Sequence, residues 1–245
     1  MQLGRRFMRH ASWDDALFVH YPVDADKLQK LLPSGLNVDR FEGVAYIGIV
    51  CLSECGIVPW PAMVPLWLVR WLGLSHHAVN VRTYVRGANN CPPGIFFFTL
   101  ECSSVLAAVG AQLLFHLPYR LSRMRRRSAA GTLQLESQRT GLTAEWRPRE
   151  PVANDALGRF FVERYTLYNP TGRLLRLLMR PGATLWHGSI THEPWPLSRA
   201  EVLAFDARGL LAAIGLDHLV GGQEDCVAHA SSGVGSIVFY WQGEP

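Results

Sequence analysis

Lysine is nearly absent from this sequence. Only two of its 24 lysine and arginine residues are lysines, Lys27 and Lys30, and both lie near the N-terminus of the 245-residue chain. A lysine forms a Schiff base with a carbonyl compound only where desolvation or a nearby positive charge lowers the pKa of its amine. The short helix expected from Asp24 to Leu32 buries its leucines, and both lysines fall outside that apolar stripe. Schiff-base chemistry is therefore not expected.

Paired cysteine spacing is missing as well, and so are the short motifs of several enzyme classes. The five cysteines lack CxxC spacing, which argues against a disulfide framework or a zinc knuckle. No GxSxG nucleophile elbow, GxGxxG dinucleotide loop or phosphate loop occurs. We therefore expect the cysteines to act as small apolar core residues, and we expect no cofactor.

Histidines lie close to one another in two places, His76–His77 and His187–His192, and the second group adjoins Glu193. Neither group has the i, i+4 helical spacing with which paired histidines bind zinc, and neither has an identifiable third ligand. We expect no metal site. The prolines that flank Trp195 favour a rigid extended segment that closes one end of a cavity.

The net charge of +4 and the isoelectric point near 8.9 permit only weak attraction to anions. The arginine-rich stretch 120–127 is the most basic segment, but no aromatic residues that could stack on bases are interleaved with it. Nucleic acid is therefore not an expected partner.

The first residues lack the apolar core of a secretory signal, so we expect a cytoplasmic protein. Three prolines and Arg70 interrupt the apolar stretch Ile57–Leu74, which argues against a membrane span. We expect a loop and a short helix there, presented to a cavity mouth or to a second subunit of a homo-oligomer. This segment carries Trp60, Trp67 and Trp71.

One domain is expected over residues 1–245, since no linker or repeat divides the chain. Helices are predicted at 154–165 and after Ser198, where Ser198 and Glu201 have capping-box spacing. Strands are predicted at 45–52, 78–85, 94–102, 111–116, 132–137, 142–146, 174–179, 183–190 and 235–241. Many strands with few helices indicate an α+β protein whose antiparallel sheet most simply closes into a barrel.

Side-chain alternation shows where polar chemistry could lie on these strands. Asn80, Arg82 and Tyr84 share one face of their strand, which in a barrel could be the inner face. On the next strand Glu101 shares a face with Phe97 and Thr99. An internal Arg82–Glu101 salt bridge is the alternative to a binding site, because buried charges are usually paired within the protein.

Several ordered segments resemble a known family. They are FVHYPVDADKLQKLLPSGLNVDRFEGVAYIGIV (18–50), NVRTYV (80–85), FFFTLE (96–101), FHLPYRLSRM (115–124), ERYTLY (163–168) and HEPWPL (192–197). Together they are similar to the bacterial YqjF-like proteins, domain of unknown function 2071, from about Trp13 to Trp241. The resemblance implies the acetoacetate decarboxylase-like superfamily: a closed, cone-shaped antiparallel β-barrel with flanking helices and an internal, largely apolar cavity. Acetoacetate decarboxylase itself works through a lysine Schiff base, for which this chain has no suitable residue.

The family-like segments hold the candidate site residues. Glu101 and His116 are the candidates for moving a proton in an enzymatic reaction. The candidate ligand-binding residues offer guanidinium, phenol, imidazole, amide and indole groups, and they are Asn80, Arg82, Tyr84, Tyr119, Arg120, Arg164, Tyr165, Tyr168, His192 and Trp195. For Arg164 the alternative is a salt bridge with Glu163.

These residues favour a barrel that binds a small, partly apolar organic acid or carbonyl compound. The protein would be either a binding protein or a lyase-like enzyme without Schiff-base chemistry, with Arg82 holding a carboxylate or enolate. The other class is a noncatalytic structural or interaction protein that uses the tryptophan-rich segment as its interface.

Overall fold

The computed structural model describes residues 4–59, 74–87, 91–115, 117–153, 155–170, 185–222 and 225–243. The helices are α1 (Ala25–Gln29), α3 (Val105–Phe115), α4 (Ala156–Val162) and α6 (Arg208–Ala212). The strands are β1 (Arg5–Val23), β2 (Leu36–Val38), β3 (Ala45–Pro59), β4 (Leu74–Gly87), β5 (Pro93–Cys102), β6 (Tyr119–Leu121), β7 (Met124–Ala129), β8 (Thr132–Ser137), β9 (Leu142–Pro151), β10 (Thr166–Pro170), β11 (Leu185–Thr191), β12 (Leu197–Asp206) and β13 (Val227–Gly243).

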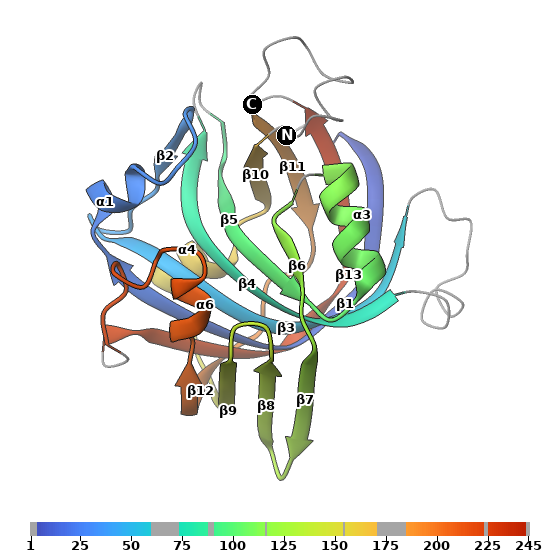
Figure 1. Ribbon diagram of the computed structural model, residues 1–245, viewed down its shortest axis with the longest axis vertical. Coiled ribbons are helices and arrows are strands. Elements are labelled where there is room, and N and C mark those ends of the chain that lie inside the picture. Colours follow the sequence, from blue (N-terminus) through green and yellow to red (C-terminus); the bar gives the residue numbers. More distant parts are fainter. Residues whose placement is uncertain are drawn as a thin grey trace.

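Seven strands form a closed circuit of hydrogen-bonded neighbours. The order is β1-β3-β4-β5-β10-β11-β13, and β13 pairs back onto β1. The β1–β13 pairing is long and runs from Arg5 opposite Trp241 to His20 opposite Val227, so both ends of the described chain lie on one side of the circuit (Figure 1). A circuit of this kind has an inside and an outside, and side-chain alternation assigns residues to each.

The sequence analysis predicted an antiparallel sheet, but the sheet is mixed. β5 pairs in parallel with β10, through Leu167 opposite Ile95 and Tyr168 opposite Phe96, and in parallel with the short β6. The parallel β5–β10 pairing joins the first half of the circuit to the second.

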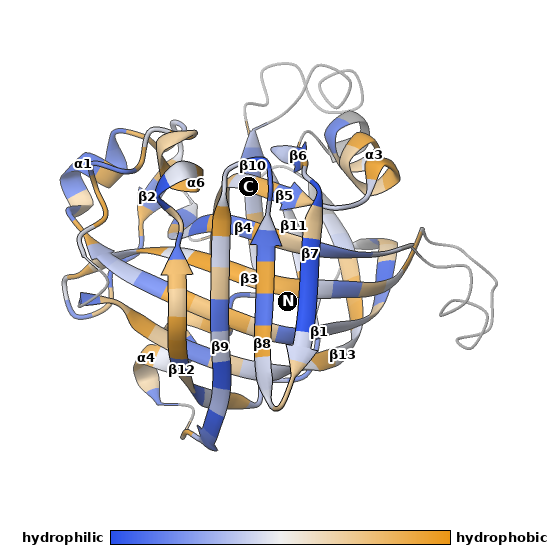
Figure 2. Cartoon of the chain, turned by 60° about the horizontal axis from the view of Figure 1, so that its bottom comes forward, coloured by the Kyte–Doolittle hydropathy of each residue, from blue (hydrophilic) through white to orange (hydrophobic). Residues whose placement is uncertain are grey.

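A second layer covers the outside of the circuit. β12 pairs with β13 and continues through β9 and β8 to β7, and these strands cross in front of β1 and β3 (Figure 2). Between the layers lies a core that includes Leu17 and Ile49 from the circuit and Leu135 and Trp146 from the covering strands. Burial of these apolar side chains holds the layers together.

Alternation along β1 and β3 separates this outer core from an inner one. Leu17 and Ile49 pack outward, whereas their neighbours Phe18 and Val50 belong to a cluster inside the circuit. The same alternation places the side chain of Glu54 on the inner face with Val50, because the two residues are four positions apart.

Two predicted elements have a different structure. Residues 111–115 of the strand expected at 111–116 belong to α3, whose Ala- and Leu-rich sequence suits a helix and whose Ala107 N–H donates a hydrogen bond to the Ser104 hydroxyl. The expected helix after Ser198 is strand β12, because pairing with β9 and β13 outweighs the capping-box pattern.

Helix starts were predicted more accurately. Asp24 caps α1 by accepting hydrogen bonds from the backbone N–H groups of Asp26 and Lys27. The helix predicted from residue 154 is the shorter α4, which is capped by Asp155. The strand expected at 174–179 and the tryptophan-rich segment 60–71 lie outside the described residues.

Candidate pocket inside the strand circuit

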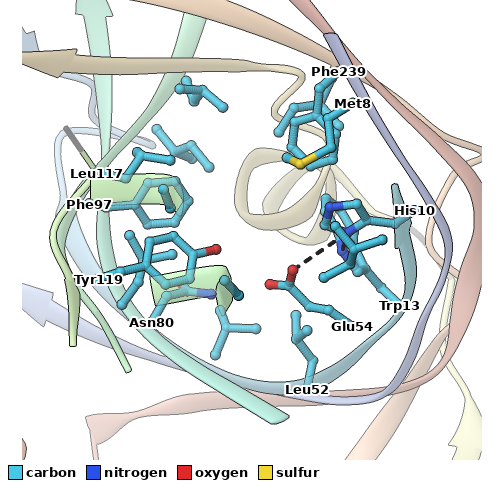
Figure 3. Close-up of a pocket in the computed structure, with 18 of the residues that line it drawn as sticks. Met8, His10, Trp13, Leu52, Glu54, Asn80, Phe97, Leu117, Tyr119 and Phe239 are labelled. Carbon is cyan, nitrogen blue, oxygen red and sulfur yellow. Dashed lines mark hydrogen bonds and ion pairs between the residues drawn. The ribbon is translucent and has the colours of Figure 1, made fainter. Parts of the chain in front are cut away.

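A pocket of about 250 Å³ lies inside the circuit. All seven circuit strands contribute to its wall, together with α3, α4 and the segment around His192. Most of the wall is apolar, and a few polar side chains point into it (Figure 3). Apolar pockets with a few convergent polar groups are typical of small-molecule sites.

Glu54 provides the carboxyl group of this pocket. It follows Val50 and Leu52 on the inner face of β3, is only 7% exposed, and points into the pocket (Figure 3). Among the described residues no Lys or Arg lies within 4.0 Å of its carboxylate. Within the described part of the chain, Glu54 is therefore a buried carboxyl group without a cationic partner.

Glu54 Oε2 lies 3.4 Å from His10 Nδ1, but the contact is not a salt bridge. His10 Nδ1 accepts a hydrogen bond of 2.9 Å from the indole N–H of Trp13, so this nitrogen carries no proton to give to Glu54. Burial, with His76 nearby, also lowers the pKa of His10 to about 3. His10 is consequently neutral, with its proton on Nε2.

The protonation of Glu54 follows from its surroundings. Burial raises the pKa of Glu54 from 4.5 to about 7, because neither neutral histidine compensates the charge of the carboxylate. Burial likewise lowers the pKa of His76 to about 4, with a smaller contribution from His77. Glu54 can thus exist as an acid or as a base near neutral pH.

Other polar atoms at this end of the pocket lack protein partners. His10 Nε2, both ring nitrogens of His76 and Asn80 Oδ1 are buried and have no hydrogen-bond partner among the described residues. Buried polar groups are normally hydrogen-bonded, so such atoms on a pocket wall suit a polar ligand.

Tyr119 lies opposite Glu54. Its ring comes from β6, and its hydroxyl oxygen points across the pocket towards Glu54 (Figure 3). Burial, together with the nearby Glu54 and Cys102, raises the pKa of this hydroxyl well above its usual value. Tyr119 therefore remains a hydrogen-bond donor at neutral pH.

Arg82 provides a positive charge elsewhere on the wall. Its Nη2 donates a 3.0 Å hydrogen bond to the Phe161 carbonyl, and its guanidinium carbon lies 5.8 Å and 5.9 Å from the ring centres of Phe18 and Tyr84. Within the described part of the chain no carboxylate pairs with it, so the Arg82–Glu101 salt bridge that was the alternative to a binding site is not formed. Arg82 is half-buried and electrically unpaired there.

Arg164 adds to this positive region. Its Nη1 lies 2.8 Å from Asp39 Oδ2, so its salt bridge is with Asp39 and not with Glu163, the partner considered as the alternative to a binding role. Arg86 Nε binds the other oxygen of Asp39 at 2.7 Å. Burial lowers the pKa of Arg164, and Asp39 opposes this shift. One carboxylate therefore serves two arginines, Arg86 and Arg164.

The segment around His192 closes the wall between these regions. Trp195 stacks on Trp13 with ring centres 6.0 Å apart, and His192 lies 5.5 Å from Trp13 and 4.9 Å from Tyr165. Burial is the main reason that the pKa of His192 is lowered, and the charge of Arg82 contributes.

Six of the candidate ligand-binding residues line the pocket, namely Asn80, Arg82, Tyr119, Arg164, His192 and Trp195. The other four do not. Tyr84 packs behind Arg82, Tyr165 bonds to Glu163, Tyr168 donates to the Pro92 carbonyl at 2.6 Å, and Arg120 is exposed on β6.

The candidate proton-transfer residues are placed differently from the expectation. Glu101 is buried but faces away from the pocket, where Ser137 donates to it at 2.5 Å, Thr140 donates at 3.2 Å, and Arg139 lies 3.7 Å away. This satisfied carboxylate belongs to the fold rather than to the pocket. His116 lies outside the described residues.

The sequence analysis overlooked Glu54, His10 and His76. A signal was present: on β3 a glutamate follows two apolar residues at the same two-residue spacing, and a charged residue on an otherwise apolar face is unusual. The contact between His10 and Glu54 joins residues far apart in the sequence, so no local pattern could indicate it.

No group of three His, Cys, Asp or Glu side chains in the described ranges is placed to hold a metal ion. Searching the same ranges for helices that are long and apolar enough to cross a membrane finds none. Lys27 and Lys30 are exposed, and neither lines the pocket.

Comparison with solved structures gives the class of fold. The chain is similar to acetoacetate decarboxylase from Legionella pneumophila, with a TM-score of 0.62 and 12% identity over 98% of this chain and 87% of that one. It is also similar to the enduracididine biosynthesis enzyme MppR complexed with pyruvate, with a TM-score of 0.61 and 12% identity over 97% and 90% of the two chains. The protein therefore has an acetoacetate decarboxylase-like fold.

Sequence comparison gives the family. The model of DUF2071, described as an uncharacterized conserved protein, matches residues 10–235. The chain is also 31% identical over 203 residues to the uncharacterized protein YqjF of Bacillus subtilis (strain 168), covering 78% of this chain and 75% of that protein. The chain belongs to the DUF2071 family, as its ordered motifs predicted.

Proposed function

We propose that this protein binds a small, partly apolar organic acid that carries a carbonyl group, and that it does so in the pocket inside the strand circuit. The observation that carries the proposal is Arg82, which lies on a mainly apolar wall and has no carboxylate partner among the described residues. An unpaired charge in such a place is costly, and a ligand carboxylate would compensate it with charge-assisted hydrogen bonds.

The circuit is, in this proposal, the cone-shaped barrel of the acetoacetate decarboxylase-like fold with an internal cavity. Pairing of β13 with β1 and lining of the pocket by every circuit strand support this view. The volume of about 250 Å³ lies just below the roughly 300–1,000 Å³ that is typical of ligand pockets. The ligand is accordingly small.

The chemistry open to this pocket differs from that of a lysine-dependent decarboxylase. Both lysines of the sequence are exposed, and neither reaches the pocket wall. A reaction here would be lyase-like in using acid–base groups on a carbonyl compound without a covalent Schiff base. A solved structural neighbour, MppR, was complexed with pyruvate, which is also an oxo acid.

Arg82→Met tests the carboxylate contact. As the probe we choose 6-oxoheptanoate, a small acid with an apolar chain and a carbonyl group. We expect this variant to fold and to bind the probe about 10- to 100-fold more weakly, which is the usual effect of losing one charge-assisted hydrogen bond in a partly buried site. Isothermal titration calorimetry measures the affinity, and thermal unfolding checks the fold.

Arg120→Met is the matched control, because it removes an exposed guanidinium on β6 that does not line the pocket. Its affinity should equal that of the wild type. Unchanged affinity in Arg82→Met would contradict the proposed carboxylate site. Loss of folding only in Arg82→Met would show that the contact with the Phe161 carbonyl is structural, and Arg82→Lys would then test the charge alone.

A further inference from the structure

The polar groups of the pocket are divided between two regions along the same pair of strands. In the β3–β4 register Glu54 is opposite His76, whereas Gly48 is opposite Arg82. Glu54 and Gly48 are six positions apart on β3, which corresponds to about 20 Å of extended strand. The long side chains narrow this distance, but the carboxyl group and the guanidinium remain at different ends of the pocket.

This separation restricts the ligand. A carboxylate held by Arg82 cannot have its adjacent carbon beside Glu54. Between the two ends the wall is apolar, with Phe18, Val50 and Ile95 among its residues. A ligand that uses both ends therefore has a carboxylate, an aliphatic chain and a polar group at the far end, which is a different arrangement from a short 2-oxo acid.

The far end is suited to a carbonyl group. The Tyr119 hydroxyl is a donor that faces Glu54 across the pocket (Figure 3), and His10 carries its remaining proton on an unpartnered Nε2. A carbonyl oxygen placed there would accept a hydrogen bond, and its neighbouring carbon would lie next to the carboxyl group of Glu54.

We propose that Glu54 is the proton-transferring residue of this pocket, and that it acts on the carbon next to a ketone that is several carbons away from the ligand's carboxylate. This inference rests on the proposed function of the pocket. It assigns the role to Glu54 in place of Glu101, and it specifies the ligand class as a small oxo acid whose ketone is remote from its carboxylate.

The step is balanced without a cofactor. The Glu54 carboxylate takes a proton from the carbon next to the ketone, the C–H electron pair becomes the C=C bond of the enolate, and the carbonyl π electrons move to oxygen. The enolate oxygen accepts a hydrogen bond from Tyr119. Return of a proton from the Glu54 carboxyl group to the same carbon restores the ketone, so no oxidant or reductant is consumed.

The surroundings of Glu54 agree with this role. Neutral His10 and His76 provide no compensating charge, and burial places the pKa of Glu54 at about 7, so both the acid and the base form are present near neutral pH. A proton-transferring group works best when its pKa lies close to the working pH.

Hydrogen–deuterium exchange tests the inference. Wild type, Glu54→Gln and Glu101→Gln are each incubated in D2O with pyruvate, 4-oxopentanoate and 6-oxoheptanoate, and proton NMR follows the loss of signal next to each ketone. We expect wild type and Glu101→Gln to accelerate exchange of 6-oxoheptanoate at least tenfold over buffer, and Glu54→Gln to give the buffer rate. Pyruvate should exchange at the buffer rate with every variant.

Glu101→Gln is the matched control because it changes a second buried glutamate that lies outside the pocket. Binding of 6-oxoheptanoate without exchange that depends on Glu54 would overturn this inference and leave the proposed function standing. Failure of every acid to bind wild type would overturn both. A separate infrared titration of the carboxyl band that Glu54→Gln abolishes needs no ligand, and ionisation of Glu54 already at pH 5 would also overturn the inference.

Discussion

Glu54 shows how a single buried residue couples the site to stability. Its pKa is about 7 in the folded protein and near 4.5 in an exposed chain, so the folded state binds more protons between these pH values. Stability therefore falls as the pH rises from 4.5 to 7. The cost is complete above pH 7 and is about 3 kcal/mol by the usual conversion of pKa shifts.

Glu54→Gln should remove this cost. At pH 5 the variant and the wild type should have similar free energies of unfolding, because Glu54 is protonated in the folded state and resembles the amide. At pH 8 the variant should be more stable, by up to about 3 kcal/mol. Urea unfolding at the two pH values measures the difference, and Glu136→Gln on the exposed side of β8 is the control. A difference that does not vary with pH would contradict the raised pKa.

Mutation of Glu101 should lower the stability of the protein, whereas Glu54→Gln should raise it at pH 8. Glu101→Ala leaves Ser137, Thr140 and Arg139 without their shared acceptor, so we expect it to lower the free energy of unfolding by about 3 kcal/mol. Its affinity for 6-oxoheptanoate should not change, because its carboxylate does not face the pocket. Calorimetric titration at a temperature where the variant is folded checks this. A large loss of affinity in Glu101→Ala would contradict this prediction and would show that Glu101 contributes to ligand binding.

Residue-level prediction from the sequence was good where two-residue alternation decides the answer and poor where a long-range contact decides it. Alternation put Asn80 and Arg82 on one face, and both line the pocket. Glu101 follows the same rule, but it points away from the pocket because the register shifts between β4 and β5 at Val81 and Arg82.

At the scale of elements, the parallel β5–β10 pairing is the shortest strand pairing in the circuit. Its register consists of two residue pairs, and Gly94 lies directly before them. A Cβ on Gly94 would lie 2.4 Å from the backbone oxygen of Thr166 and 2.8 Å from the Tyr168 ring. Only glycine allows the strands to approach this closely.

Gly94→Ala should therefore weaken the pairing of β5 with β10. We expect a loss of about 1–3 kcal/mol in the free energy of unfolding, as for other overpacked sites, and weaker binding of 6-oxoheptanoate because β5 contributes to the pocket wall. The control is Gly222→Ala, whose Cβ would meet no atom within 4 Å. Chemical denaturation measures both variants. Equal stability of Gly94→Ala and wild type would contradict this prediction, because it would show that the β5–β10 pairing tolerates the added methyl group.

Elements were predictable from sequence when local pattern and tertiary pairing agreed. Asp24 at the start of α1 and the hairpin of β8 and β9 are such cases. The segment after Ser198 is not, since its local pattern favours a helix and its pairing with β9 makes it a strand. The parallel pairing of β5 joins strands distant in sequence, and no local pattern specifies it.

At the scale of the whole molecule, the covering strands and the circuit strands have different roles. The covering strands β7, β8, β9 and β12 bury the outer faces of β1 and β3 in an apolar core, which leaves the inner faces free to carry polar groups. The polar groups that alternation places inside the circuit are then held on rigid strands rather than on loops. Such positioning is what a small-molecule site requires.

The resemblance to the DUF2071 family rested on ordered motifs over nearly the whole chain, and the family match confirms it. The acetoacetate decarboxylase-like fold that the resemblance implied agrees with the solved structures. The same resemblance could not supply a reaction, because the lysine chemistry of acetoacetate decarboxylase has no counterpart in this pocket. The roles that we propose for Arg82 and Glu54 rest on the surroundings of these side chains, which only the three-dimensional structure shows.

Native mass spectrometry of the protein purified from the organism that makes it tests the central claim most directly. The complex is dissociated and the released molecule is identified. We expect one small organic acid per chain, with a ketone remote from its carboxylate, and we expect Arg82→Met purified in the same way to lack it. A chain that is consistently empty, or one that carries a molecule without an acidic group, would contradict the account.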